Sequence, residues 1–154
     1  MASEERKALE IGLKPLMNEL GYKTRGPTWH RYTSNVIQVL NIQGSQWSKD
    51  FHVNLGVYFR EIGTEDKPGE IDCHIRQRLC AVVDDRQSYN RTLSFDSGID
   101  LVERVRELRR LVSEFAIPWL EKCSGIEGAR NYLLHEEKSA FPVLEVTWEY
   151  LGIE

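Results

Sequence analysis

The chain has 154 residues, of which 41% are hydrophobic and 29% charged, and its formal net charge is -4 with a pI of about 5.6. A chain of this size and composition can bury a core without disulfides or structural metals, so we expect residues 1–154 to form a single domain. The acidic balance argues against a polycation that binds nucleic acid over its whole surface.

Cysteine content and the lack of long apolar runs bear on the cellular compartment of the protein. Cys73, Cys80 and Cys123 are odd in number and match no zinc-binding spacing, which is typical of reduced thiols in a cytosolic protein. The first residues, MASEERKALEIGLKPL, are acidic and lack the basic start and apolar run of a signal peptide. No apolar run approaches the ~20 residues that cross a bilayer. We therefore expect a cytoplasmic protein that does not contact a membrane.

Leucine spacing predicts a helix near the N-terminus. Apolar residues recur at helical intervals over Leu9–Leu20, and Gly21 is placed to end the helix. Pro15 lies inside this pattern and cannot donate a backbone hydrogen bond. We therefore expect either one helix with a kink or break near residues 11–14, or two short helices.

Short runs of β-branched and aromatic residues follow, separated by polar or glycine-rich loops, which is typical of strands. Residues 35–43 are apolar enough for a strand covered on both faces, and residues 51–59 alternate between an apolar and a polar face. Strands joined by short loops are usually antiparallel neighbours, so we expect a β-meander of about four to five strands. Its strands are residues 28–32, 35–43, 51–59 and 70–79.

The second half of the chain is predicted to be mostly helical. Residues 82–95 are weakly patterned, and we expect a loop there with at most one short strand. Ser97 can cap a long helix with an apolar stripe over Leu101–Phe115, and Pro118 should limit its far end. A shorter helix over residues 125–134 and a last strand or short helix over residues 141–151 complete the expected elements.

These elements predict an α+β fold, because helices must bury their apolar stripes against the meander. We expect the N-terminal helix and the long helix of the C-terminal half to pack on one face of the sheet. There the strand face of Val53, Leu55 and Val57 should meet the helix stripe of Leu101, Val105, Leu108 and Val112. The other face of the sheet should be polar and should carry Asn41 and Gln43.

One stretch concentrates ionisable groups on that polar face. Alternation over residues 70–79 places Asp72, His74, Arg76 and Arg78 on one side of a strand. Histidine and arginine side chains in a row suit an anion or an acidic partner, because guanidinium pairs with carboxylate and phosphate. The competing interpretation is that the arginines pair with nearby acids and solvate an exposed face. The candidate binding residues are His52, Asn54, Asp72, His74, Arg76, Arg78 and, as the exposed aromatic of a polar loop, Trp47.

Metal binding and catalysis receive little support. His52, His74 and Asp72 could approximate a metal donor set on neighbouring strands, but hydrogen-bonded histidines on a sheet face are commoner, so we expect no metal. The chain has no G-x-S-x-G, no P-loop and no G-x-G-x-x-G. We therefore expect no cofactor, assign no catalytic residue, and leave open whether the protein is an enzyme.

Three blocks of sequence carry a family resemblance. LKPLMNELGYKTRGPTWHRY, NVIQVLNIQGSQWSKDFHVNLGVYF and IDCHIRQRL occur in this order. Together they resemble the bacterial family catalogued as domain of unknown function 4304, over residues 9–80. Members of that family often carry a tryptophan-rich stretch after the arginine strand, where this chain has DRQSYNRT at residues 85–92. The resemblance implies a small α+β fold and implies no activity.

Two functions remain in competition. The first is a non-catalytic binding module whose polar and aromatic sheet face recognises a protein partner, in the manner of small acidic immunity proteins that bind toxins. The acidic pI and the missing catalytic motifs favour it. The second is a protein or enzyme that binds a small phosphate or carboxylate through His74, Arg76 and Arg78. Net charge disfavours nucleic acid as a partner. In either case we expect Arg76 and Arg78 to serve recognition more than stability.

Overall fold

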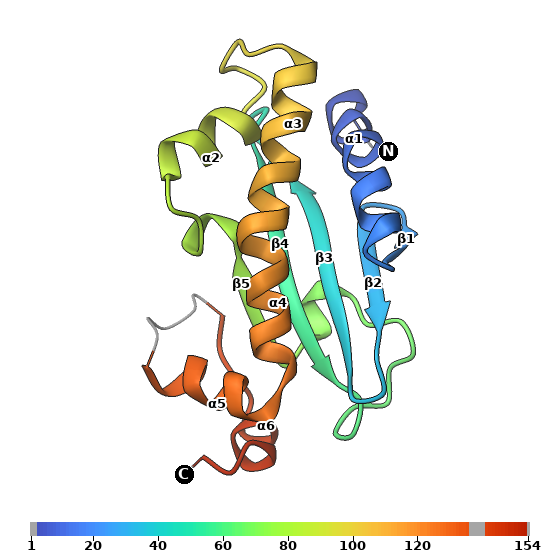
Figure 1. Ribbon diagram of the computed structural model, residues 1–154, viewed down its shortest axis with the longest axis vertical. Coiled ribbons are helices and arrows are strands. Elements are labelled where there is room, and N and C mark those ends of the chain that lie inside the picture. The colour runs from blue at the N-terminus through green and yellow to red at the C-terminus, as the bar shows by residue number, and fades with distance from the viewer. Residues whose placement is uncertain (1–2, 136–140, 154) are drawn as a thin grey trace.

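The computed structural model describes residues 3–135 and 141–153, which form a five-stranded antiparallel sheet with helices on one face (Figure 1). The strands pair in chain order, each with the next, so the predicted meander and the α+β class are confirmed. A three-residue strand at residues 23–25 was not predicted. The strands are β1 Lys23–Arg25, β2 Thr28–Tyr32, β3 Val36–Gly44, β4 Phe51–Phe59 and β5 Ile75–Arg78.

Helices occupy the N-terminus and most of the second half of the chain (Figure 1). No helix among the described residues is long and apolar enough to cross a membrane. The α-helices are α1 Glu4–Glu19, α2 Arg86–Leu93, α3 Leu101–Leu111, α4 Ile117–Ser124, α5 Ile126–His135 and α6 Glu145–Tyr150. Single turns of 3-10 helix lie at η1 Glu70–Asp72 and η2 Leu79–Ala81, and a π-helical turn, η3 Val112–Ala116, joins α3 to α4.

The main core lies between the helices and one face of the sheet. Alternation in the strands aligns Trp29, Leu40 and Leu55 across β2, β3 and β4, and each is at most 1% exposed. Leu13 of α1 and Leu108 of α3 belong to the same buried cluster. The predicted packing of Leu55 and Leu108 in one core is therefore confirmed, but the predicted stripe is wrong at Leu101, which is 49% exposed.

α1 runs without a break through Pro15, so the expectation of a break or of two helices is wrong. Pro15 lies on the exposed side of the helix, as does Ile11, whose carbonyl loses its helical donor. Water can satisfy an exposed carbonyl, which explains why the helix tolerates the proline. The hydroxyl of Ser3 caps the helix by accepting from the backbone N–H of Arg6 at 3.1 Å.

Residues 82–95 do not form the expected loop, because α2 occupies residues 86–93. Asp85 caps this helix by accepting from the backbone N–H groups of Gln87 and Ser88. Tyr89 and Leu93, one helical turn apart, are buried in the main core. The mostly polar composition of the segment hid this short apolar stripe.

The long helix differs from its prediction at both ends. Its cap is Asp100, which accepts from the backbone N–H of Glu103 at 2.8 Å, and not Ser97. Its far end is not set by Pro118, because α3, η3 and α4 continue as helix to Ser124. In η3 the N–H of Ile117 donates to the carbonyl of Val112, five residues back. This wider turn directly before Pro118 relieves the clash that a proline causes inside an α-helix. Over residues 141–151 the sequence left a last strand or a short helix open, and the structure has the short helix α6.

Candidate functional site

The sheet has an outer face, turned away from the core helices, and the segment of residues 61–73 covers part of it. Under this segment Ile37, Val39, Tyr58 and Cys73 form a second, small buried cluster. β3 is therefore covered on both faces over this part of its length, as predicted. The segment can approach closely because of Gly56, where an added Cβ would lie 2.5 Å from the sulfur of Cys73.

A row of polar residues crosses the uncovered part of the outer face. The strand register aligns one residue from each strand, and we call this row the polar ladder: Arg25, Thr28, Asn41, Asn54 and Arg78. The amide of Asn41 donates to the Thr28 hydroxyl at 2.9 Å, and the amide of Asn54 donates to Asn41 Oδ1 at 3.2 Å. The Asn54 amide also donates to Gln43 Oε1 at 2.9 Å. Hydrogen bonds thus run from β2 to β4 and orient the side chains.

Three polar atoms in or beside the β4–β5 end of the ladder have no hydrogen-bond partner within the described part of the chain. Asn54 Oδ1, Arg78 Nε and His52 Nδ1 are all buried and make no hydrogen bond there. Asn54 as a whole is 2% exposed. A buried donor or acceptor without a partner costs free energy, so native structures rarely keep one without a reason. Three of the eight such atoms in the described part of the chain lie here, on the adjacent strands β4 and β5.

His52 adds a neutral imidazole beside the ladder. It pairs with Gln43 across β3 and β4, two residues before Asn54. Burial lowers the pKa of His52, the positive charge of Arg78 lowers it further, and Asp50 opposes both. The ring is therefore uncharged near pH 7 and presents one donor and one acceptor.

Arg76 lies on the same face of β5 as Arg78 but is held by other groups. Its Nε and Nη2 donate to the two carboxylate oxygens of Glu70 at 2.9 and 3.1 Å. Its guanidinium also lies 3.9 Å from the centre of the Phe141 ring, whereas Arg78 lies 5.9 Å from it. Pairing with a nearby acid, one of the two interpretations made from the sequence, therefore applies to Arg76. Arg78 lies opposite Asn54 in the polar ladder, and its role in binding stays a prediction.

Asp72 and His74 lie outside the strand, because β5 begins only at Ile75. The carboxylate of Asp72 accepts from the backbone N–H of Gly69 and closes the turn η1. His74 Nδ1 accepts from the backbone N–H of Phe59 at 2.9 Å, and burial lowers the pKa of this histidine. The predicted alternation from Asp72 to Arg78 is therefore wrong at its first half, since a 3-10 turn interrupts the extended chain.

Trp47 lies in the loop that joins β3 to β4 and is 90% exposed, as its polar loop predicts. Gln43 and His52 lie close to the two ends of this loop, and its last residues contact the helical side of the molecule, where the N–H of Phe95 donates to the carbonyl of Lys49 at 3.0 Å. The backbone N–H of Trp47 donates to the Ser45 hydroxyl at 3.3 Å, which shapes the loop. An exposed indole beside aligned polar groups suits contact with another macromolecule.

No cluster of three or more metal-ligating side chains occurs among residues 3–135 and 141–153. His52 lies near the ladder, while His74 and Asp72 are engaged by Phe59 and Gly69, so the three do not act as one group. Thr28 and Arg25 were missed as site residues. The meander register could have identified Thr28, whereas Arg25 depends on β1, which is too short to be predicted from alternation.

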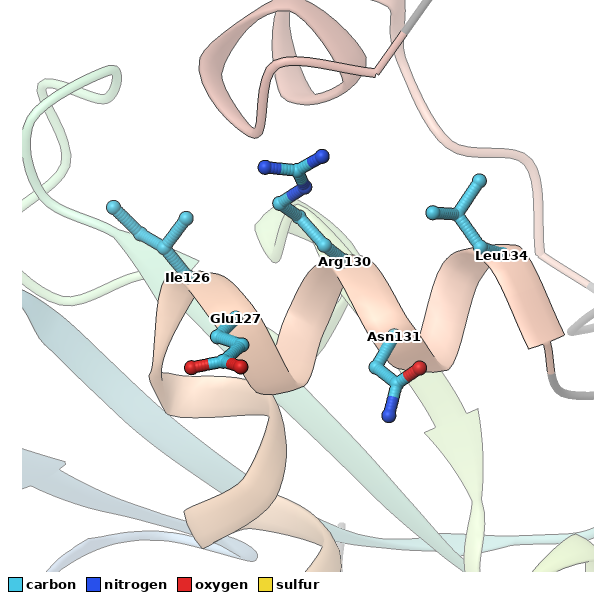
Figure 2. A pocket seen from close by; sticks show the side chains of 5 residues that line it. All are labelled: Ile126, Glu127, Arg130, Asn131 and Leu134. Atoms are coloured by element: carbon cyan, nitrogen blue, oxygen red, sulfur yellow. The ribbon is translucent and has the colours of Figure 1, made fainter.

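A separate hollow of about 630 Å³ lies along α5 (Figure 2). Ile126, Arg130 and Leu134 project from one side of the helix, and Glu127 and Asn131 from another. In the described residues this hollow is lined by α5 alone. Among residues 3–135 and 141–153 it therefore brings together no groups from different elements, unlike the outer face.

A family model with the description "Domain of unknown function (DUF4304)" matches residues 13–122 of the chain. The matched region contains all five strands, and thus the polar ladder and Trp47. Comparisons with curated proteins and with solved structures gave no match.

Proposed function

Since the chain belongs to the DUF4304 family, whose description states no activity, we propose from the site geometry that it is a binding module for a protein partner. The partner would cover the uncovered outer face, from Trp47 at one end to the polar ladder. The observation that carries this proposal is the set of buried atoms without partners on Asn54, Arg78 and His52.

The shape of the site favours a protein surface over a small molecule. The ladder spans all five strands, so its groups are spread across the width of the sheet. An extended polar surface with one exposed tryptophan resembles the recognition surfaces in which a few aromatic and arginine residues contribute most of the affinity. Trp47, Arg25 and Arg78 are residues of this kind, and we propose that Trp47 and Arg78 anchor the partner.

Charge indicates what the partner presents. Arg25 and Arg78 stand at the two ends of the ladder, and uncharged side chains lie between them. Carboxylates on the partner would pair with these guanidiniums. The competing small-anion site is less well supported, because Glu70 already pairs with Arg76, and the N–H of Phe59 occupies His74.

Affinity capture with variant baits tests the proposal. The full chain, Trp47→Ala and Arg78→Met are immobilised and exposed to an extract of the source cells, with Leu144→Ala as a control. Leu144 is 66% exposed and lies directly before α6, so it controls for loss of any exposed apolar group.

We expect one protein that wild type and Leu144→Ala retain, and that both site variants lose by at least about tenfold. Calorimetry with the purified partner then confirms direct binding. An identical set of captured proteins for all four baits would overturn the proposal.

A further inference from the structure

A groove of about 590 Å³ runs between α1 and α3, on the helical side of the molecule and thus opposite the outer face. Figure 1 shows the two helices side by side at the end of the molecule where both begin. Gly12 permits their close approach, since a Cβ at this position would lie 2.5 Å from Val105 Cγ2. The apolar lining consists of Ala8, Ile11, Gly12, Leu101, Val102 and Val105.

The walls of this groove are apolar and face solvent. Ile11 on α1 is 72% exposed, Val102 on α3 is 70% exposed, and Leu101 is 49% exposed. Single exposed apolar residues are ordinary, but three that line one groove form a continuous patch. The sequence explains the patch, because Ile11 and Val102 lie outside the stripes that α1 and α3 bury in the core.

The charged groups that line the groove are all positive in the described structure, although the chain as a whole is acidic. Arg106 and Arg109 line its α3 side. Lys7 and Lys14 flank Ile11 on α1 at helical spacing. Arg109 also donates to the carbonyl of Gly12 at 2.8 Å, which fixes the position of this arginine between the helices.

We infer that this groove binds an amphipathic α-helix of a partner protein, whose apolar stripe is flanked by acidic residues. Two helices with an apolar cleft between them accept a third helix through contacts at positions i, i+3, i+4 and i+7. The lysines and arginines at the rim select for acidic flanks. A second copy of this chain does not fit, because the same groove on a copy would oppose arginine to arginine. This inference is independent of the outer face and of its proposed partner.

The test uses the full chain and two labelled helical peptides of about 16 residues, each with leucines at the four contact positions. One peptide carries glutamate on both flanks of the leucine stripe and the other carries lysine. We expect the glutamate peptide to bind at least about tenfold more tightly in fluorescence anisotropy, and to weaken as salt is added.

Variants locate the binding. Val102→Glu should weaken the glutamate peptide by about tenfold, because it places a charge in the apolar cleft. Arg106→Glu should weaken the glutamate peptide by about threefold and strengthen the lysine peptide. Leu134→Glu, at a 52% exposed position on α5, adds the same charge elsewhere and should change neither affinity. Thermal unfolding of each variant confirms that it is folded.

Three results would overturn the inference. The first is equal binding of the two peptides, or no binding of either up to about 1 mM. The second is a dimer in sedimentation experiments that Ile11→Glu dissociates, which would show that a second copy covers the groove. The third is binding to anionic vesicles, about three parts phosphatidylcholine to one part phosphatidylserine, without binding to the glutamate peptide.

Discussion

Asn54 on β4 and Arg78 on β5 stand directly opposite each other, and each holds one buried polar atom with no hydrogen-bond partner in the described structure. The amide nitrogen of Asn54 is fully engaged by Asn41 and Gln43, so the side chain cannot turn to pair with Arg78 without losing those bonds. The pair is therefore oriented by the sheet, and its two buried atoms keep unused hydrogen-bonding capacity.

Arg78→Met should leave the free energy of unfolding unchanged, or raise it by up to about 1 kcal/mol. The substitution keeps the apolar stem of the side chain and removes a buried donor that has no partner, which is close to neutral or stabilising. Urea denaturation of the variant and of wild type gives the difference. A loss above about 2 kcal/mol would mean that Arg78 Nε has a structural partner and that the ladder is complete in the unbound protein.

Arg76→Met should instead destabilise the protein by about 2–3 kcal/mol. It removes the partner of Glu70, whose side chain is 7% exposed, and an uncompensated buried carboxylate is costly. Adding Glu70→Gln to the variant should recover part of the loss, because the remaining side chain is then neutral. Additive effects of the two substitutions in a double-mutant cycle would contradict a coupled pair.

Arg76 and Arg78 show a limit of prediction from the sequence. Alternation correctly placed Arg76 and Arg78 on one strand face, but it treated them as equivalent. Their difference depends on the turn η1, which brings Glu70 back over β5. A turn of this kind follows from the packing of Cys73 on Gly56, a tertiary contact that no local pattern encodes.

More of the fold than of the site could be predicted. The meander and α1 follow from periodicity, because their apolar stripes are long. α2 was missed because the contacts of Tyr89 and Leu93 outweigh a polar composition, and the continuation past Pro118 depends on the π-helical turn before it. The polar ladder depends on register, which residue spacing within one strand does not reveal.

Leu55→Ala and Leu108→Ala should each lower the free energy of unfolding by about 2–5 kcal/mol, because each leaves a cavity in the main core. Both residues are 0% exposed. Leu101→Ala is the matched control, since Leu101 lies on the same helix as Leu108 but is 49% exposed, and it should cost less than about 1 kcal/mol. Chemical denaturation measures all three, and similar losses for Leu101 and Leu108 would contradict the assigned orientation of α3.

Gly56→Ala should displace the segment that covers part of the outer face. The new methyl group would lie 2.5 Å from Cys73 Sγ and 2.7 Å from Cys73 Cβ, so the segment must shift, at a cost of about 1–3 kcal/mol. Cys73 should then react faster with a thiol reagent in a Cys80→Ser background. Gly125→Ala, where a Cβ meets nothing within 4 Å, is the control. Unchanged Cys73 reactivity would show that the segment is not held by this contact.

Stability should fall as the pH drops below about 6.5, because burial lowers the pKa of His74 below its ordinary value of 6.5, and burial lowers that of His52 too. Below about 6.5 the unfolded chain therefore binds more protons than the folded one, so stability is lost as the pH falls toward the lowered values. In the folded state a proton on His74 Nδ1 would also remove the acceptor of the Phe59 N–H.

Glu107, whose pKa is lowered chiefly by its hydrogen bond from Arg110, contributes only in a lower pH range, as the pH falls through about 4.5. Urea denaturation from about pH 8 to 5.5 therefore isolates the histidines. His74→Asn keeps an acceptor near the Nδ1 position and does not titrate, so this variant should lose less stability than wild type over that range. An equal loss in the variant would show that His74 takes up its proton alike in the folded and unfolded states.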